Sequence, residues 1–421
     1  MPESAAVSPA RARGVLAILV VVYALNFIDR NLLSVLLQPI KEELGASDSA
    51  MGFLTGPAFA LFYTAAGIPI ARLADRGSRR GLMAVGIAAW SLLTAASGAA
   101  RSFLQLALLR VGVGIGEATA TPAAHSLISD CFPPERRIGA IAVYNLGASA
   151  GIFFGLLLGG WLQQSVGWRA AFAVVGLPGV LVALLVRFGL PEPRRGAAEG
   201  RRDDAPPPSL RAVLGELLAK RSFVHLCIAA GLYGISAYGA TMWAPTFMIR
   251  VHGLSYAEVG FSLGLVIGIF GAIGGLGSGW ACQRAARRDP RWQAWLPALA
   301  GLVAIPCYVV FTLSPDPDLA LAAFAAVSLL SIVFAAPTYA LAQGLAGLRS
   351  RAQAAALVLF VLNLVGLGLG PWLIGALNDA FEPRFGTEAI RYSLTIVAFA
   401  GAWGALHSAA AARTLRQDLA S

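Results

Sequence analysis

The chain has 421 residues, of which 57% are hydrophobic and only 13% are charged, and its mean hydropathy is +0.70. A soluble domain of average composition carries roughly twice this fraction of charged residues, so the composition excludes an ordinary soluble protein and indicates an integral membrane protein. The net charge of +10 could suit a nucleic-acid-binding protein, but the basic residues follow the loops between apolar segments, which argues against that class.

Twelve mostly apolar windows are long enough to be membrane-spanning helices. They are 14–37, 50–71, 81–100, 103–127, 138–162, 170–190, 222–249, 256–281, 294–313, 319–345, 353–377 and 389–411. If the N-terminus is cytoplasmic, the loops on its side carry roughly four times as many Lys and Arg residues as the loops on the other side. This bias predicts that both termini are cytoplasmic. The excess of Arg over Lys and the abundant Ala are typical of a GC-rich bacterial genome, and hence predict a bacterial inner membrane.

Four charged residues interrupt the first and fourth windows. Asp29 and Arg30 lie in the first, and Arg110 and Glu117 lie in the fourth. An unpaired charge in hydrocarbon costs several kcal/mol, so such residues normally face a protein interior or an aqueous cavity and often carry protons, ions or substrate. Counted from the same membrane face, Asp29, Arg30 and Arg110 fall at similar depth, and Glu117 lies two helical turns deeper on nearly the same face as Arg110.

We hypothesise that these four residues form one site at the midplane of a transporter. Protonation of Asp29 or Glu117 would free Arg30 or Arg110, and a free guanidinium can hold a phosphate or carboxylate through two parallel hydrogen bonds. The sequence thus predicts proton coupling at the two carboxylates and binding of an anionic headgroup at the two arginines. The alternative interpretation is that the charges only lock the first and fourth helices together.

The loop between the second and third windows carries a definite pattern, Ala71-Arg72-Leu73-Ala74-Asp75-Arg76-Gly77-Ser78-Arg79-Arg80. It resembles the signature loop of the major facilitator superfamily. The resemblance implies an all-α membrane protein with twelve transmembrane helices in two pseudo-symmetric six-helix bundles. It also implies a cytoplasmic gating loop made of Asp75, Arg76, Arg79 and Arg80. The matching loop in the second half has Gln283 where the Asp would be.

Three further stretches are distinctive: Asn26-Phe27-Ile28-Asp29-Arg30, Arg110 to Ala118 and Leu127 to Arg137. They resemble the spinster-like group of that superfamily, whose members are proton-coupled carriers of lysophospholipids and sphingosine phosphate. The anion:cation symporter group is similar at the first two, so an organic-anion symporter remains an alternative, as does a drug exporter.

The chain divides at a polar, proline-rich stretch, 191–221, which predicts a cytoplasmic linker between an N-terminal bundle, 1–190, and a C-terminal bundle, 222–421. Within the linker, 210–218 should form a short amphipathic helix. Gly151, Gly155 and Gly160 recur at the same spacing as Gly366, Gly370 and Gly375, which favours two homologous halves, although abundant glycine also makes coincidences easy.

Aromatic and amide residues inside the windows are candidates for lining a substrate cavity, although packing between helices would explain each of them equally well. They are Tyr63, Tyr144, Asn145, Tyr233, Tyr238, Trp243, Tyr339 and Asn363.

The sequence offers no P-loop, no metal-ligand cluster and no nucleophile–base set in a sizeable loop. We therefore expect a transporter rather than an enzyme, with no cofactor and with the proton gradient as its energy source. Its expected partners are the lipid bilayer, protons and a small amphiphilic or anionic substrate. We expect it to act as a monomer and not to bind nucleic acid.

Overall fold

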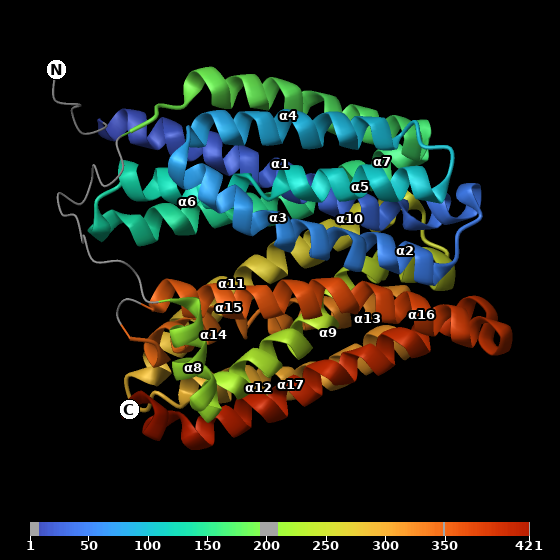
Figure 1. Cartoon of the computed structure of the whole chain (residues 1–421). Helices are drawn as coiled ribbons and strands as arrows, with labels where there is room; N and C mark the ends of the chain where they lie inside the picture. The colour runs from blue at the N-terminus through green and yellow to red at the C-terminus, as the bar shows by residue number, and fades with distance from the viewer. Residues whose placement is uncertain (1–7, 194–208, 348–349, 421) are drawn as a thin grey trace. The chain divides into compact units, whose positions relative to one another are not determined.

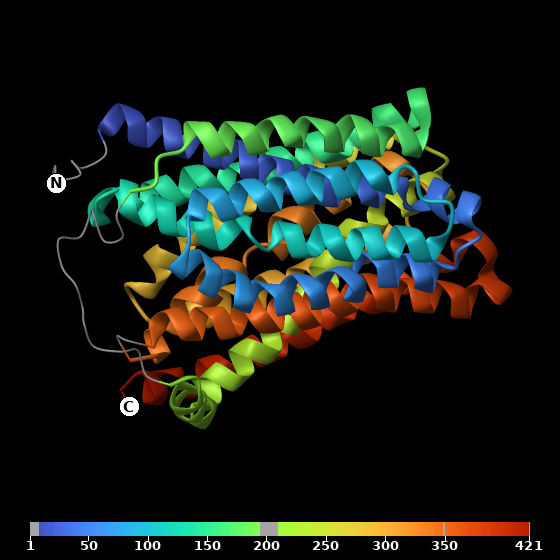
Figure 2. The same cartoon turned by 45° about the horizontal axis from the view of Figure 1, so that its top comes forward.

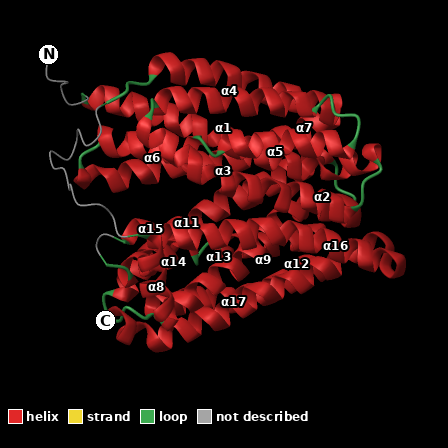
Figure 3. Ribbon diagram, viewed as in Figure 1, coloured by secondary structure: helices red, strands yellow, loops and turns green. Residues whose placement is uncertain are grey.

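A computed structural model describes residues 8–193, 209–347 and 350–420. Helices dominate the described residues, and these residues contain no β-strand (Figure 3). The chain forms two compact units. The first consists of 1–45, 61–204 and 255–264, and the second of 46–60, 205–254 and 265–421.

The first unit contains most of the N-terminal half and one helix from the C-terminal half. Its helices are α1 (Pro9–Leu44), α3 (Pro57–Arg76), α4 (Arg79–Ser97), α5 (Phe103–Glu117), α6 (Ala120–Cys131), α7 (Pro134–Gly189) and α10 (Tyr256–Leu263). Long α7 packs along both α1 and α4, and in Figure 2 the blue α4 and the green end of α7 run side by side.

The second unit contains most of the C-terminal half and one helix from the N-terminal half. Its α-helices are α2 (Asp48–Thr55), α8 (Leu210–Ala219), α9 (Arg221–His252), α11 (Gly271–Ala286), α12 (Trp292–Leu313), α13 (Pro317–Ser331), α14 (Ala335–Leu345), α15 (Arg351–Val361), α16 (Gly368–Phe385) and α17 (Ala389–Ala420). Two π-helical segments, η1 (Gly264–Phe270) and η2 (Leu362–Leu367), precede α11 and α16, and a 3₁₀ turn, η3 (Gly386–Glu388), precedes α17. Helices α9, α12 and α17 lie together in Figure 1.

Local sequence explains where several helices begin and end. Ser47, Ser78 and Ser102 each precede a helix and accept a hydrogen bond from a backbone N–H in its first turn, which satisfies a donor that the helix leaves unpaired. Gly45 ends α1 at a φ of 61°, a left-handed conformation that only glycine adopts without strain.

The predicted windows coincide with helical segments, and nine helical stretches among the described residues are long and apolar enough to cross a membrane. Some of these stretches contain more than one window. In α7, Gly167 has a φ of 81° and a ψ of 165°, so the helix direction changes between the windows 138–162 and 170–190. The number twelve stays a prediction. Of the predicted linker, residues 194–208 lie outside the described residues. The predicted short helix within it is confirmed as α8, which buries Val213 and Leu217 in the second unit.

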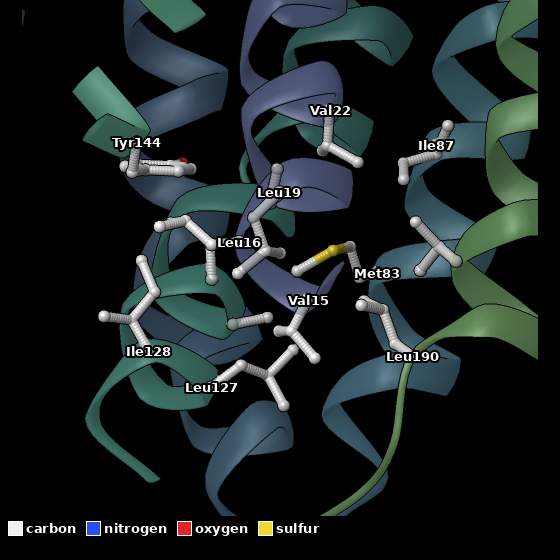
Figure 4. Packing of buried hydrophobic residues seen from close by; sticks show 14 of the residues in the cluster. Val15, Leu16, Leu19, Val22, Met83, Ile87, Leu127, Ile128, Tyr144 and Leu190 are labelled. Carbon is white, nitrogen blue, oxygen red and sulfur yellow. The ribbon is translucent and has the colours of Figure 1, made fainter. Parts of the chain in front are cut away.

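The core of the first unit lies between α1, α4, α6 and α7 (Figure 4). Val15, Leu19 and Val22 recur along one face of α1 and are at most 2% exposed, where they pack with Met83 of α4 and Leu127 of α6. This face runs for about two turns from Val15 to Val22, so it holds the beginning of α1 in place and fixes the position of the charges farther along the helix.

The two glycine triplets occupy matching environments, which supports the internal repeat. A Cβ on Gly151 or Gly155 would meet the backbone of α1, and a Cβ on Gly366 or Gly370 would meet the backbone of α9. The last members also correspond, because Gly160 touches α10 of the first unit, and its counterpart at position 375 touches α2 of the second.

Candidate functional site

The four charged residues predicted from the first and fourth windows all lie in the first unit. Asp29 and Arg30 belong to α1, and Arg110 and Glu117 belong to α5. The structure arranges them as two separate ion pairs, each joining one helix to the other.

The first pair joins Asp29 and Arg110, and both side chains are almost completely buried, with 3% and 2% exposed. Arg110 Nη1 donates to Asp29 Oδ2 at 2.9 Å and to Oδ1 at 3.2 Å, and Thr94 of α4 donates its hydroxyl to Oδ1 at 2.8 Å. Both carboxylate oxygens thus have partners. A buried charge is tolerated when it is paired and hydrogen-bonded in this way.

The second pair joins Arg30 and Glu117, and it is less symmetrical. Arg30 Nε lies 2.6 Å from Glu117 Oε2, and the Arg30 side chain is 21% exposed, whereas that of Glu117 is fully buried. The guanidinium carbon of Arg30 also lies 4.8 Å from the ring centre of Tyr63 and 5.5 Å from that of Phe27, which are cation–π contacts. Glu117 Oε1 has no hydrogen-bond partner among the described residues.

Glycine residues set the position of Glu117. Helix α5 ends at Glu117 and α6 begins at Ala120, but Ala118 and Thr119 keep right-handed helical dihedral angles, so the predicted fourth span continues through them. A Cβ on Gly116 would lie 2.9 Å from the Cβ of Trp90, and one on Gly86 would lie 1.9 Å from the Thr119 hydroxyl oxygen. The two glycines therefore let α4 approach the junction of α5 and α6 closely.

A second buried cluster lies at the start of α4, and we call Arg79, Asp130 and Glu192 the Arg79 cluster. Arg79 is 1% exposed and forms ion pairs with Asp130 of α6 and with Glu192, which follows α7. Its Nη1 also donates to the Ser126 hydroxyl at 3.0 Å. Glu192 accepts from the Ser78 hydroxyl at 2.6 Å and from the backbone N–H of Arg79 at 3.1 Å.

The sequence predicts a gating loop that contains Arg79, but it assigns no role to Asp130 or Glu192. Asp130 lies in a stretch that resembles the spinster-like group and Glu192 lies in the predicted linker, and only the fold brings them to Arg79. Of the other predicted loop residues, Arg80 donates to the Leu190 carbonyl at 3.0 Å. Asp75 and Arg76 end α3, and their side chains lie outside the described part of the structure.

The Arg79 cluster makes stability depend on pH through Glu192. Burial alone would raise the pKa of this carboxyl, but hydrogen bonds from Ser78, Arg79 and two backbone N–H groups outweigh it and lower the pKa. A lowered pKa means that the stabilisation is complete above the unfolded-state value of about 4.3 and is lost as the pH falls through the folded-state value. We expect Glu192→Gln to lower the unfolding temperature at pH 7. The difference in unfolding temperature between this variant and wild type should shrink below about pH 5.

Thermal unfolding in detergent over this pH range checks the prediction. Glu216→Gln, at an exposed position in α8, is the control and should follow the wild-type curve at every pH. A Glu192→Gln curve that stays parallel to wild type down to pH 4 would contradict the assignment.

The predicted cavity-lining residues separate into different environments. In the first unit, Tyr63 lies over Arg30, whereas Tyr144 is fully buried and stacks on Tyr23 with 4.3 Å between ring centres. Asn145 is exposed. Of these three, Tyr63 is the residue placed beside the charges.

In the second unit, most of these candidates have packing partners. The Tyr233 hydroxyl donates to the Pro297 carbonyl at 2.9 Å, and the Trp243 indole donates to the Pro371 carbonyl at 2.8 Å. The remaining candidates, Tyr238, Tyr339 and Asn363, are partly buried.

A small cavity adjoins the break between α13 and α14 in the second unit. Its volume is about 20 Å³, and Tyr233, Ser236, Tyr308 and Ser331 contribute to its lining. A cavity of this size holds a single water molecule. It is too small for an organic substrate.

The described residues contain no cluster of three or more His, Cys, Asp or Glu side chains that could hold a metal ion. The charged site itself consists of two carboxylates and two guanidinium groups.

Comparisons with known proteins identify the family of the chain. The sequence profile of the Major Facilitator Superfamily matches residues 19–371. The chain is 37% identical to an MFS-type efflux pump of Mycolicibacterium smegmatis, over 98% of this chain and 95% of the relative. It is 29% identical to protein spinster homolog 1 of Homo sapiens, over 94% of this chain and 80% of the relative.

A solved structure gives the same result. The chain is similar to a bacterial homolog of the human lysosomal transporter Spinster in an inward-facing and unoccupied conformation, with a TM-score of 0.88 and 31% identity over 98% of this chain and 99% of that one. The same homolog in an inward-facing and occupied conformation gives a TM-score of 0.86. The profile covers most of the chain, and the relatives match it almost from end to end. The chain therefore belongs to the Major Facilitator Superfamily, within which it is a spinster-like transporter and not an enzyme.

Proposed function

We propose that this transporter is proton-coupled and carries an amphiphilic anion such as a lysophospholipid by alternating access. The observation that carries the proposal is the difference between its two buried ion pairs. Asp29 and Arg110 satisfy each other and are closed to solvent, whereas the Arg30 side chain is 21% exposed and Glu117 keeps one oxygen without a partner among the described residues. The second pair is therefore the one that can exchange partners.

In the proposed cycle, a proton binds Glu117 and neutralises it. Arg30 then loses its counter-charge, and its guanidinium binds the phosphate or carboxylate of the substrate in place of the carboxylate. Proton and anion are thus bound cooperatively, because each stabilises the state that accepts the other. When the site opens to the other side, the anion leaves, Glu117 releases its proton and the ion pair forms again.

In this proposal Asp29 and Arg110 have a different task from the one predicted from the sequence. They hold α1 against α5 and keep the site electrically balanced, so that a single proton changes its net charge. We place the transporter in a bacterial inner membrane with both termini cytoplasmic, on the basis of the loop charges and the composition, and we propose that it acts as a monomer.

Liposomes that contain the purified protein and a pH-sensitive dye in the lumen test the proposal. Addition of lysophosphatidyl lipid should move protons across the membrane in the presence of protein and not in its absence. A proton flux that appears only with small carboxylates would instead support an organic-anion symporter. The absence of flux with either class would refute the proposed coupling.

A drug exporter is the second candidate, and the 37% identity to an MFS-type efflux pump favours it. The two candidates differ in the charge of the substrate, because Arg30 selects an anion in the first and would repel a cationic drug. The drug exporter would be supported if the protein exports a cationic dye, and if protons but not lysolipid compete with that dye.

A further inference from the structure

The two compact units exchange segments, and one of the exchanged segments is held by charges. Residues 46–60 belong to the second unit although the chain on both sides of them belongs to the first. This segment contains α2, and α2 packs against α16. Helix α2 follows the first predicted span, and α16 ends just before the last predicted span. Their contact therefore lies on the membrane side opposite to the N-terminus.

The contact between α2 and α16 is close enough to bring backbone against backbone. A Cβ on Gly52 would lie 2.5 Å from the Pro371 carbonyl oxygen, and one on Gly375 would lie 2.2 Å from the Asp48 carbonyl oxygen. Because no side chain separates the two helices, polar groups at the start of α2 come within hydrogen-bond distance of the end of α16.

The carboxylate of Asp379 in α16 caps the N-terminus of α2. Its Oδ1 accepts from the backbone N–H of Asp48 at 2.9 Å, and its Oδ2 accepts from that of Ser49 at 2.8 Å. A carboxylate at this position satisfies two N–H groups that the helix itself leaves unpaired, and it lies at the positive end of the helix dipole.

Asp48 itself is 2% exposed and completes the cluster. Arg250, near the end of α9, donates from Nη2 to Asp48 Oδ1 at 2.7 Å and from its other terminal nitrogen to Oδ2. Asn378 Nδ2 donates to Oδ2 at 2.9 Å. Three helices, α2, α9 and α16, are thus joined through one buried carboxylate.

The corresponding contact in the first unit is built differently. Helix α10 packs on α7 through Gly160 and Gly260, and a Cβ on either would lie within 2.4 Å of a carbonyl oxygen of the other helix. The polar bond there is neutral, from the Ala257 N–H to Gln164 Oε1 at 3.0 Å. Both contacts, α10 on α7 and α2 on α16, share the close approach at glycine that the internal repeat predicts. The ionic cluster described above lies at the contact of α2 with α16.

We propose that Asp48, Arg250, Asn378 and Asp379 form a latch that holds α2 on α16 and α9, and that release of this latch opens the transporter on the side opposite to the N-terminus. The inference rests on the alternating access of the proposed function, which requires a contact on that side to form and break in each cycle. Charged residues suit a contact that must form and break. A buried ion pair is specific in geometry, yet it is little more stable than the same two charges separated and hydrated once water can enter.

The test measures whether α2 detaches, without using a substrate. The full chain, with its four natural cysteines replaced by alanine and Met51→Cys as reporter, is placed in lipid nanodiscs and treated with a small maleimide. Met51 lies in α2 and is 1% exposed, so labelling requires α2 to move. We expect Asp48→Asn to raise the labelling rate by about tenfold or more, which corresponds to about 1.4 kcal/mol of opening free energy. Asp379→Asn should raise it in the same direction.

Glu43→Gln is the matched control. Glu43 pairs with Arg169 at 2.7 Å in the first unit and takes no part in the contact between α2 and α16, so loss of this bond should not release α2. Equal labelling in Asp48→Asn, Asp379→Asn and the parent would overturn the latch, and so would an equal increase in Glu43→Gln. Monodisperse elution is required of each variant, and if Asp48→Asn does not fold, Asp379→Asn decides the question. Since no substrate is present, a failure of the latch is distinguishable from a failure of the proposed transport reaction.

Discussion

We expect Glu117→Gln to abolish the substrate-driven proton flux, reducing it to the background of empty liposomes, while the protein stays folded and binds its substrate. Glutamine has nearly the same size as glutamate and can still accept a hydrogen bond from Arg30, but it carries no charge and binds no proton. It therefore imitates the protonated state, in which Arg30 is ready for an anion. The measurement is proton flux in liposomes, with substrate binding followed separately by ligand-induced thermal stabilisation.

Two comparisons make this result specific to the site. Glu43→Gln removes an exposed ion pair of the same unit and should leave the proton flux at the wild-type level. Glu117→Asp keeps a titratable group but shortens its reach to Arg30, so it should retain a weakened flux. An unchanged flux in Glu117→Gln would remove this residue from the coupling role.

Asp29→Asn should destabilise the folded protein by about 3–5 kcal/mol, because it leaves a buried arginine without a counter-charge. The Arg110 side chain is 2% exposed, and a guanidinium cannot lose its proton in a protein. Glu117→Gln should cost less, because Arg30 is partly exposed and keeps its contacts with Tyr63 and Phe27. Unfolding in detergent, followed for both variants under the same conditions, measures the difference.

A second substitution tests the reason for the loss. Arg110→Gln in the Asp29→Asn background removes the uncompensated charge and leaves two neutral groups that can hydrogen-bond to each other, so most of the lost stability should return. If the double variant is less stable than Asp29→Asn alone, the arginine is not the source of the loss. Equal effects of Asp29→Asn and Glu117→Gln would contradict the distinction between a fixed and an exchangeable pair.

The sequence was sufficient to predict the helical fold and the residues of the charged site, because the cost of charge in hydrocarbon is independent of tertiary structure. It could not predict the pairing. Asp29 and Arg30 are adjacent and point to different sides of α1, so depth alone does not decide which of them meets Arg110.

The latch and the Arg79 cluster were missed for a different reason. Asp48 and Asp379 are 331 residues apart at their hydrogen bond, and Glu192 stands in a stretch whose composition is that of a linker. In the sequence, each of these acidic residues looks like an ordinary loop charge. The basic side chains and the helix N-terminus that they contact in the structure are far away along the chain. Hydrophobic periodicity and local motifs report on neighbours along the chain, and these contacts are not local.

The exchange of segments between the two units also has a consequence for biosynthesis. The ribosome completes α2 early, but α16, against which it packs, follows more than 300 residues later. At about 5–20 residues per second, α2 waits roughly 15–60 s for this partner. During that interval its glycine-lined face and Asp48 lack the groups that cover them in the finished protein. The second unit cannot reach its final packing until nearly the whole chain has been made, so a truncated nascent chain should remain a substrate for membrane quality control even when its first six spans have been inserted.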